Sequence, residues 1–67
     1  MEKYHYRGRA KKTWYYPVEE GIYFKAYSDS DAGVVFKSLT GLSKSNGDEV
    51  EIEGYDTDFK FWSEVVV

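Results

Sequence analysis

The chain has 67 residues, of which 19% are aromatic: seven Tyr, four Phe and two Trp. A chain of this length buries only about 60% of the surface that it exposes when unfolded, so we expect one small domain, residues 1–67, with a thin core. It has no cysteine, which excludes disulfides and thiolate metal sites.

The net charge of −3 is unevenly distributed along the chain. Residues 1–17 hold five basic residues and one acidic residue, whereas residues 18–67 hold four basic and eleven acidic residues. The simplest expectation is that these two regions attract each other within one molecule. No apolar run approaches the ~20 residues that cross a bilayer, and the start lacks the apolar segment of a signal peptide. We therefore expect a cytoplasmic protein with no membrane contact.

The first two predicted elements are strands. Residues 4–11 alternate aromatic or small side chains with cationic ones, which predicts a strand with one aromatic and one cationic face. Residues 22–27 alternate in the same way, with Ile22 and Phe24 facing inward, and this strand can pair with the first. Between them, Pro17 marks a strand end or edge, and residues 19–21 predict a turn.

The hydrophobic period becomes helical after residue 27. Ser28 and Asp31 have the spacing of a capping box, and Gly41 suits a helix C-terminus. We predict a helix from about Asp29 to Thr40. Because Gly33 and the two valines after it are poor helix formers, a third strand over residues 34–39 stays open, and it would make a small all-β barrel. The helical spacing is carried by Ala32, Val35, Phe36, Leu39 and Leu42.

Residues 48–67 predict a β-hairpin. Acidic and aliphatic side chains alternate over residues 49–53, which points Val50 and Ile52 to the core and the three glutamates to water. Asn46-Gly47 supplies the turn before this strand and residues 54–58 the turn after it. On the return strand, the inward face is expected to carry Phe59, Phe61, Val65 and Val67.

The predicted fold class is α+β, in the order β-β-α-β-β. An antiparallel sheet of about four strands carries one helix packed on one face. The expected core contains one of Tyr4 and Tyr6 together with Ile22, Phe24, Val35, Leu39, Val50, Ile52, Phe59 and Phe61.

The hairpin is the first candidate binding surface. Residues 48–58 contain six acids and no base, and alternate glutamates of a strand lie ~6.7 Å apart on one face. Such a row is similar to a phosphate backbone in sign and regularity, so it can occupy the basic groove of a nucleic-acid-binding protein. The alternative is a solvated face that protects an edge strand from aggregation. The predicted partner-binding residues are Glu49, Glu51, Glu53, Tyr55, Asp56, Asp58 and Trp62.

The basic N-terminal segment, residues 3–16, is the second candidate surface. Cations that follow a backbone and rings that stack on bases are typical of single-stranded nucleic-acid binding. Alternation places these rings and cations on opposite faces, which favours the other reading, in which the tyrosines pack in the core and the cations pair with acids. The alternative nucleic-acid-binding residues are Tyr4, Tyr6, Arg7, Arg9, Lys11, Lys12 and Trp14.

No catalytic, metal or cofactor motif is recognisable. The only histidine is His5, and the acidic pairs at residues 29–31 and 56–58 lack the glycine and closing glutamate of a calcium loop. We expect a non-enzymatic protein-binding module. By analogy of size and charge alone, it suits a phage or mobile-element inhibitor of the anti-CRISPR kind that blocks a nucleic-acid-binding protein. A homodimer that completes the thin core through an edge strand is a further alternative.

Overall fold

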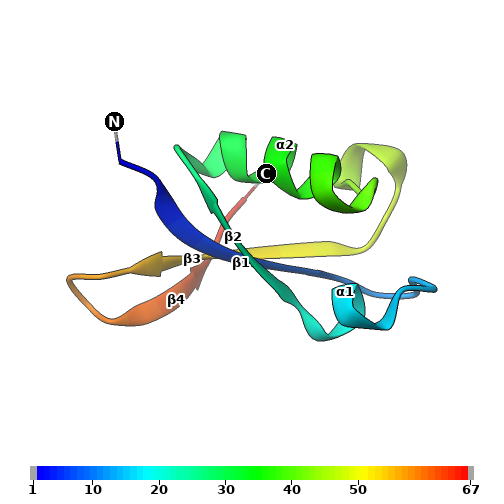
Figure 1. Cartoon of the computed structure of the whole chain (residues 1–67), viewed down its shortest axis with the longest axis horizontal. Coiled ribbons are helices and arrows are strands. Elements are labelled where there is room, and N and C mark those ends of the chain that lie inside the picture. The colour runs from blue at the N-terminus through cyan, green and yellow to red at the C-terminus, as the bar shows by residue number, and fades with distance from the viewer. Residues whose placement is uncertain (1, 67) are drawn as a thin grey trace.

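The computed structural model describes residues 2–66 and contains one antiparallel sheet with the strand order β2-β1-β3-β4. Helix α2 lies along one face of this sheet (Figure 1). The predicted α+β architecture is confirmed, and the alternative of a closed all-β barrel is wrong because β2 and β4 are the two ends of an open sheet. In chain order the elements are β1 (Tyr4–Ala10), α1 (Tyr16–Glu20), β2 (Ile22–Ala26), α2 (Asp29–Thr40), the 3-10 turn η1 (Lys44–Asn46), β3 (Val50–Asp56) and β4 (Phe61–Glu64).

Strand alternation decides which side chains of β1 enter the core. Tyr6, Gly8 and Ala10 are buried beneath α2, whereas His5 and Arg9 lie exposed on the opposite face. A Cβ atom added at Gly8 would lie 2.4 Å from the Phe36 ring. The position therefore needs glycine because the helix side chain rests directly on the strand.

Helix α2 occupies the predicted residues. The Ser28 Oγ accepts a hydrogen bond from the Asp31 N–H at 3.1 Å, and the Asp31 carboxylate accepts one from the Tyr27 N–H at 2.9 Å. Gly41 ends the helix in the left-handed conformation, with φ 76°. These two caps and the burial of Phe36 outweigh the low helix propensity of the glycine and valines inside the segment.

The Tyr6 hydroxyl ties β1 to the first turn of α2. It donates a hydrogen bond to the Asp29 carboxylate at 2.8 Å. Burial, and then this bond, raise the pKa of Tyr6 to about 12. One of Tyr4 and Tyr6 was expected in the core, and it is Tyr6 that lies there, whereas Tyr4 is exposed.

A short helix replaces the turn predicted at residues 19–21. Helix α1 has Pro17 in its first turn, where the missing N–H costs nothing, and the N–H of Gly21 bonds back to the Pro17 carbonyl at 3.0 Å. Its Val18 side chain is buried in the core. No helix formed by residues 2–66 has the length and apolar character needed to cross a membrane.

The expected core is correct at Val50 and Ile52 and wrong at three other positions. Phe59 lies in the β3–β4 turn rather than in a strand and is 73% exposed. Phe61 is also exposed, and its ring is tilted against that of Phe59 with centroids 5.9 Å apart. Leu39 projects from a flank of α2 and is 59% exposed. The predicted inward position at residue 67 lies outside the described residues. Ile22, Phe24, Val35 and Leu42 border the core, which consists of Tyr6, Ala10, Val18, Ala26, Ala32, Phe36, Val50, Ile52 and Val65.

Candidate functional site

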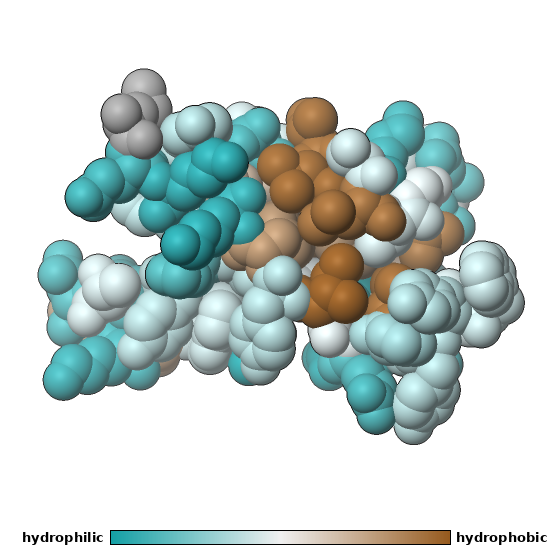
Figure 2. All heavy atoms as spheres, viewed as in Figure 1, coloured by the Kyte–Doolittle hydropathy of each residue, from teal (hydrophilic) through white to brown (hydrophobic). Residues whose placement is uncertain are grey.

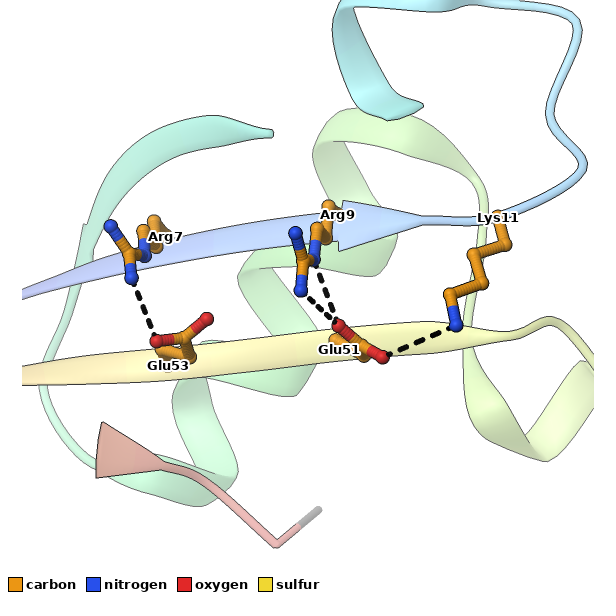
Figure 3. Close-up of polar contacts among 5 residues, drawn as sticks. All are labelled: Arg7, Arg9, Lys11, Glu51 and Glu53. Atoms are coloured by element: carbon orange, nitrogen blue, oxygen red, sulfur yellow. Dashed lines mark hydrogen bonds and ion pairs between the residues drawn. The ribbon is translucent and has the colours of Figure 1, made fainter. Parts of the chain in front are cut away.

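The cationic face of β1 lies beside the glutamates of β3. The strand register places Arg7 opposite Glu53 and Arg9 opposite Glu51. Figure 3 shows the resulting ion pairs, with nitrogen–oxygen distances of 2.9 Å and 2.8 Å. A hydrogen bond from Arg9 holds the pKa of Glu51 below its usual value, and the bond to Glu53 raises the pKa of Arg7. Both shifts favour the charged forms of Arg7 and Glu51.

Two lysines extend this row of ion pairs. The Lys11 ammonium lies 3.8 Å from the second carboxylate oxygen of Glu51, and the Lys12 ammonium lies 3.3 Å from Glu49. Each of the three glutamates of the predicted acidic face is thus paired with a cation of the basic segment. The charge ladder, which we define as Arg7, Arg9, Lys11 and Lys12 with Glu49, Glu51 and Glu53, is a surface of mixed sign rather than a row of one sign.

Three aromatic rings meet on the same face of the sheet. Trp62 on β4 stands opposite Tyr55 on β3, with ring centroids 5.1 Å apart, and lies 5.9 Å from the ring of Tyr23 on β2. The guanidinium carbon of Arg7 on β1 lies 4.6 Å from the centroid of the Trp62 ring. All four strands therefore contribute one residue to this open-face aromatic cluster, defined as Arg7, Tyr23, Tyr55 and Trp62.

Arg7 is held at the centre of the cluster by its neighbours in the sheet. It lies opposite Tyr23 on one side and Glu53 on the other, and the ion pair with Glu53 fixes the guanidinium against the indole ring. A shallow groove of about 520 Å³ runs over these rings and is also lined by His5 and Lys25. The site is thus aromatic at its centre and charged at its border.

This arrangement changes how the basic segment is interpreted. Its own rings do lie away from its cations, as alternation predicts, because Tyr4 and Tyr6 face the side of α2. Other strands, however, bring Tyr23, Tyr55 and Trp62 to the cationic face. Rings and cations are therefore neighbours after all, through strand pairing rather than through local sequence.

The remaining predicted partner-binding residues lie in another place. Asp56 and Asp58 belong to the turn between β3 and β4, where the Asp56 carboxylate accepts hydrogen bonds from the N–H groups of Asp58 and Phe59 at 2.9 Å and 3.3 Å. Both acids line a cleft of about 500 Å³ between this hairpin and the start of α2. Figure 2 shows the molecular surface hollowed on that side. The structure therefore groups Tyr55 and Trp62 together but separates these two aspartates from the paired glutamates.

The alternative nucleic-acid-binding set is also divided. Trp14 lies in the loop after β1, 94% exposed, with its ring 5.6 Å from that of Tyr15. The cations of the set belong to the charge ladder. The predicted sets omit Tyr23 and Lys25, although both occupy outward positions of the strand predicted over residues 22–27, and that alternation is the signal that could have included them.

Within residues 2–66, no cluster of three or more histidine or acidic side chains has the arrangement needed to hold a metal ion. Comparisons with family models, with curated proteins and with solved structures gave no match for this chain. By its fold, the chain is an α+β protein with a four-stranded antiparallel sheet. Helix α2 covers one face of the sheet, and the open face carries the aromatic cluster.

Proposed function

We propose that the protein is a non-enzymatic, cytoplasmic protein-binding module that contacts its partner through the open-face aromatic cluster. The observation that carries this proposal is the assembly of Tyr23, Tyr55 and Trp62 around Arg7 on the face that α2 does not cover. Tyr, Trp and Arg are the residues most often found at the energetic centres of protein interfaces. Their positions on a paired sheet lower the entropy that binding has to overcome.

The mixed charge of the surrounding surface favours a protein partner. A protein interface typically has an apolar or aromatic centre and a polar border, and here the charge ladder lies beside the rings. A nucleic acid would require cations that are not already neutralised, and a groove that normally holds phosphates would require unpaired acids. The pairs at Glu51 and Glu53 oppose both requirements.

The narrower form of the proposal is an inhibitor of a nucleic-acid-binding protein. The net charge of −3 and the small size support it, and Tyr55 and Trp62 would act as its anchors. In this form, lysines and arginines of the target would have to displace the cations of the charge ladder from Glu51 and Glu53. Binding would then weaken as the ionic strength rises, because salt screens the attraction between a basic target groove and the net charge of −3 of this chain.

Single-stranded nucleic acid is the second candidate ligand, and one specific observation favours it. Arg7 and Trp62 lie in contact on the same face, and Lys25 and His5 border the groove over the rings. Bases stack on aromatic rings with little regard to sequence, and each stacked base contributes about 1–3 kcal/mol. The two candidates therefore use the same surface and differ in the ligand that it holds.

A comparison of two tryptophan variants tests the proposal. The tagged protein, Trp62→Ala and Trp14→Ala are each used to capture partners from a cell lysate, with and without nuclease, and the captured material is identified by mass spectrometry. We expect one defined protein that survives nuclease treatment and whose recovery falls at least about tenfold with Trp62→Ala. Trp14→Ala is the matched control, because this ring is exposed in a loop outside the cluster.

Each other outcome has a definite meaning. If the protein partner is retained equally by Trp62→Ala and by the wild type, the contact surface is not the aromatic cluster and the proposal fails. If nucleic acid is recovered and every protein is lost after nuclease treatment, the second candidate replaces the first.

A further inference from the structure

The edge strand β2 has hydrogen-bonding groups directed away from the sheet. The N–H of Lys11 donates to the carbonyl of Glu49 on β3. The backbone N–H and C=O groups of successive residues point to alternate sides of an antiparallel strand. The groups of Gly8 and Tyr6 therefore point to the other neighbour of β1, which is β2, where these residues face Ile22 and Phe24. The backbone groups of Tyr23 and Lys25 must then point outward, to an edge that no other strand of residues 2–66 occupies.

The side chains of this edge are complementary to a second copy of the same strand. In an antiparallel pair centred on a twofold axis at Phe24, Tyr23 of one copy stands opposite Lys25 of the other. The outward groups of these two residues would form four backbone hydrogen bonds across the axis. No like charges oppose each other, and a ring faces an ammonium group twice on the open face. On the other face, Phe24 meets its own copy.

The flank of α2 above this edge is apolar and uncovered. A helix turns about 100° per residue, so Val35 and Leu39 lie on one flank of α2 and Gly33 and Lys37 on the other. Gly33 and Lys37 border a groove that reaches Val50 on β3, which places the flank of Val35 and Leu39 on the side of β2. Figure 2 shows hydrophobic residues gathered over α2 and continuing below it over the sheet.

The exposure of Leu39 indicates that this flank lacks a packing partner. It lies at the helical spacing of core residues, yet it is 59% exposed. Ile22, Phe24 and Val35 are only partly buried at the border of the core. A chain of 67 residues buries too little apolar surface to leave such a flank in water without a stability cost. A neighbour on this side would complete the core of each copy.

We propose that two copies of the chain form a twofold dimer in which β2 pairs with β2 and the α2 flanks pack against each other. The two sheets then join into one eight-stranded antiparallel sheet. A single symmetric surface serves both copies, as is usual for dimers. Both open-face aromatic clusters lie on the same side of the joined sheet, so the dimer presents the proposed binding surface twice. The dimer itself does not depend on that binding function.

Sedimentation equilibrium over a wide range of protein concentrations tests the dimer with a matched pair of variants. Leu39→Glu places a charge on the α2 flank that faces β2, and Val34→Glu places the same charge on the outer surface of the same helix, away from the sheet. Both positions are exposed in the single chain, 59% and 66%, so both variants are expected to fold. We expect a dimer mass for the wild type and Val34→Glu, and a dissociation constant raised at least about tenfold for Leu39→Glu.

A second variant tests the strand pairing itself. Lys25→Pro removes an N–H that points away from β1, so the bonds between β1 and β2 stay intact while two of the four bonds across the axis are lost. Circular dichroism checks that the variant keeps the fold, and its dissociation constant is expected to rise at least about tenfold. The dimer is refuted by a wild-type mass that stays monomeric at all concentrations. A dimer that Leu39→Glu and Lys25→Pro leave unchanged refutes this interface.

Discussion

The two faces of the sheet are built from the same strands and differ in almost every physical property. Beneath α2, the strands contribute Tyr6, Ala26 and Ile52 to a core that contains no buried charged residue among residues 2–66. On the open face, the next residues along the same strands carry rings and paired charges such as Arg7 and Glu53. A one-residue step along a strand therefore separates the residues that hold the fold from those available for binding.

The covered face determines the stability of the fold, and the open face carries the proposed recognition surface. Close packing makes the covered face sensitive to the loss or addition of single carbon atoms. The ion pairs of the open face remain in contact with water and contribute little to the free energy of unfolding. Substitutions on the covered face should therefore change stability strongly, and substitutions on the open face should change it weakly.

Phe36→Ala is expected to have the largest effect on stability. The ring is fully buried between α2 and the sheet and contacts the ring of Phe24, with centroids 6.1 Å apart. Its removal leaves a cavity and should lower the free energy of unfolding by about 3–5 kcal/mol, which is comparable to the entire stability of a small domain. Urea unfolding followed by circular dichroism measures the change.

Val34→Ala is the control for this substitution, because its side chain lies on the exposed surface of the same helix. It should change the free energy of unfolding by no more than about 0.5 kcal/mol. Equal effects of the two variants would mean that α2 does not pack on the sheet as described.

Tyr6→Phe is expected to have an intermediate effect and a distinct pH dependence. The variant loses the hydrogen bond to Asp29 and should be less stable by about 1 kcal/mol at neutral pH. The pKa of Tyr6 is raised to about 12 in the folded chain, above a value of about 10 for the unfolded chain. Stability from this group is therefore complete below pH ~10 and is lost as the pH rises from there toward 12.

Thermal unfolding at pH values from 8 to about 12 measures this loss. The wild type should lose more stability than Tyr6→Phe over the alkaline range. Tyr4→Phe is the matched control, because Tyr4 is an exposed tyrosine on the same strand, and it should behave like the wild type. An alkaline loss that is identical in all three proteins would show that Tyr6 ionises as freely when folded as when unfolded.

Glu51→Gln on the open face is expected to have the smallest effect. Its hydrogen bond with Arg9 lowers the pKa of Glu51 in the folded chain. Stability from this pair is therefore present above the unfolded pKa of about 4.3 and is lost as the pH falls from there through the lower folded value. Glu51→Gln should remove this part of the acid loss, which thermal unfolding between pH 7 and about 2 measures.

Glu19→Gln serves as the comparison for the acid range. Glu19 is exposed on α1 and makes no salt bridge within the described part of the chain. Its acid profile should match that of the wild type. If Glu51→Gln and Glu19→Gln flatten the profile equally, the charge ladder contributes nothing specific to stability.

Local sequence patterns were sufficient for the elements of the fold and for part of the site. The helix from Asp29 to Thr40 could be predicted because its caps and its apolar spacing lie within one short segment. The hairpin pattern alone placed Tyr55 and Trp62 outside the core, and the structure has both rings half-buried on the open face. Phe59 was misplaced because β3 continues to Asp56, so the turn lies at residues 57–60 rather than at residues 54–58. Lys60, with φ 56°, ends this turn in the left-handed conformation.

Contacts between strands were beyond the reach of those patterns. The open-face aromatic cluster joins Tyr23 to Trp62 across the width of the sheet, and no local period indicates such a contact. The exposure of Leu39 was also beyond local patterns. The helical spacing assigns Leu39 to the apolar side of α2, but it does not show how far the sheet extends beneath the helix.

The amino-acid sequence by itself determined the alternation of the strands, the caps of α2 and the opposite charges of the two regions of the chain, because each depends on residues close together along the backbone. Only the tertiary structure decided that β1 lies between β2 and β3. That position pairs Arg7 with Glu53 and sets it against Trp62. Strand order and register bring distant residues together, and these depend on how the whole sheet packs against α2.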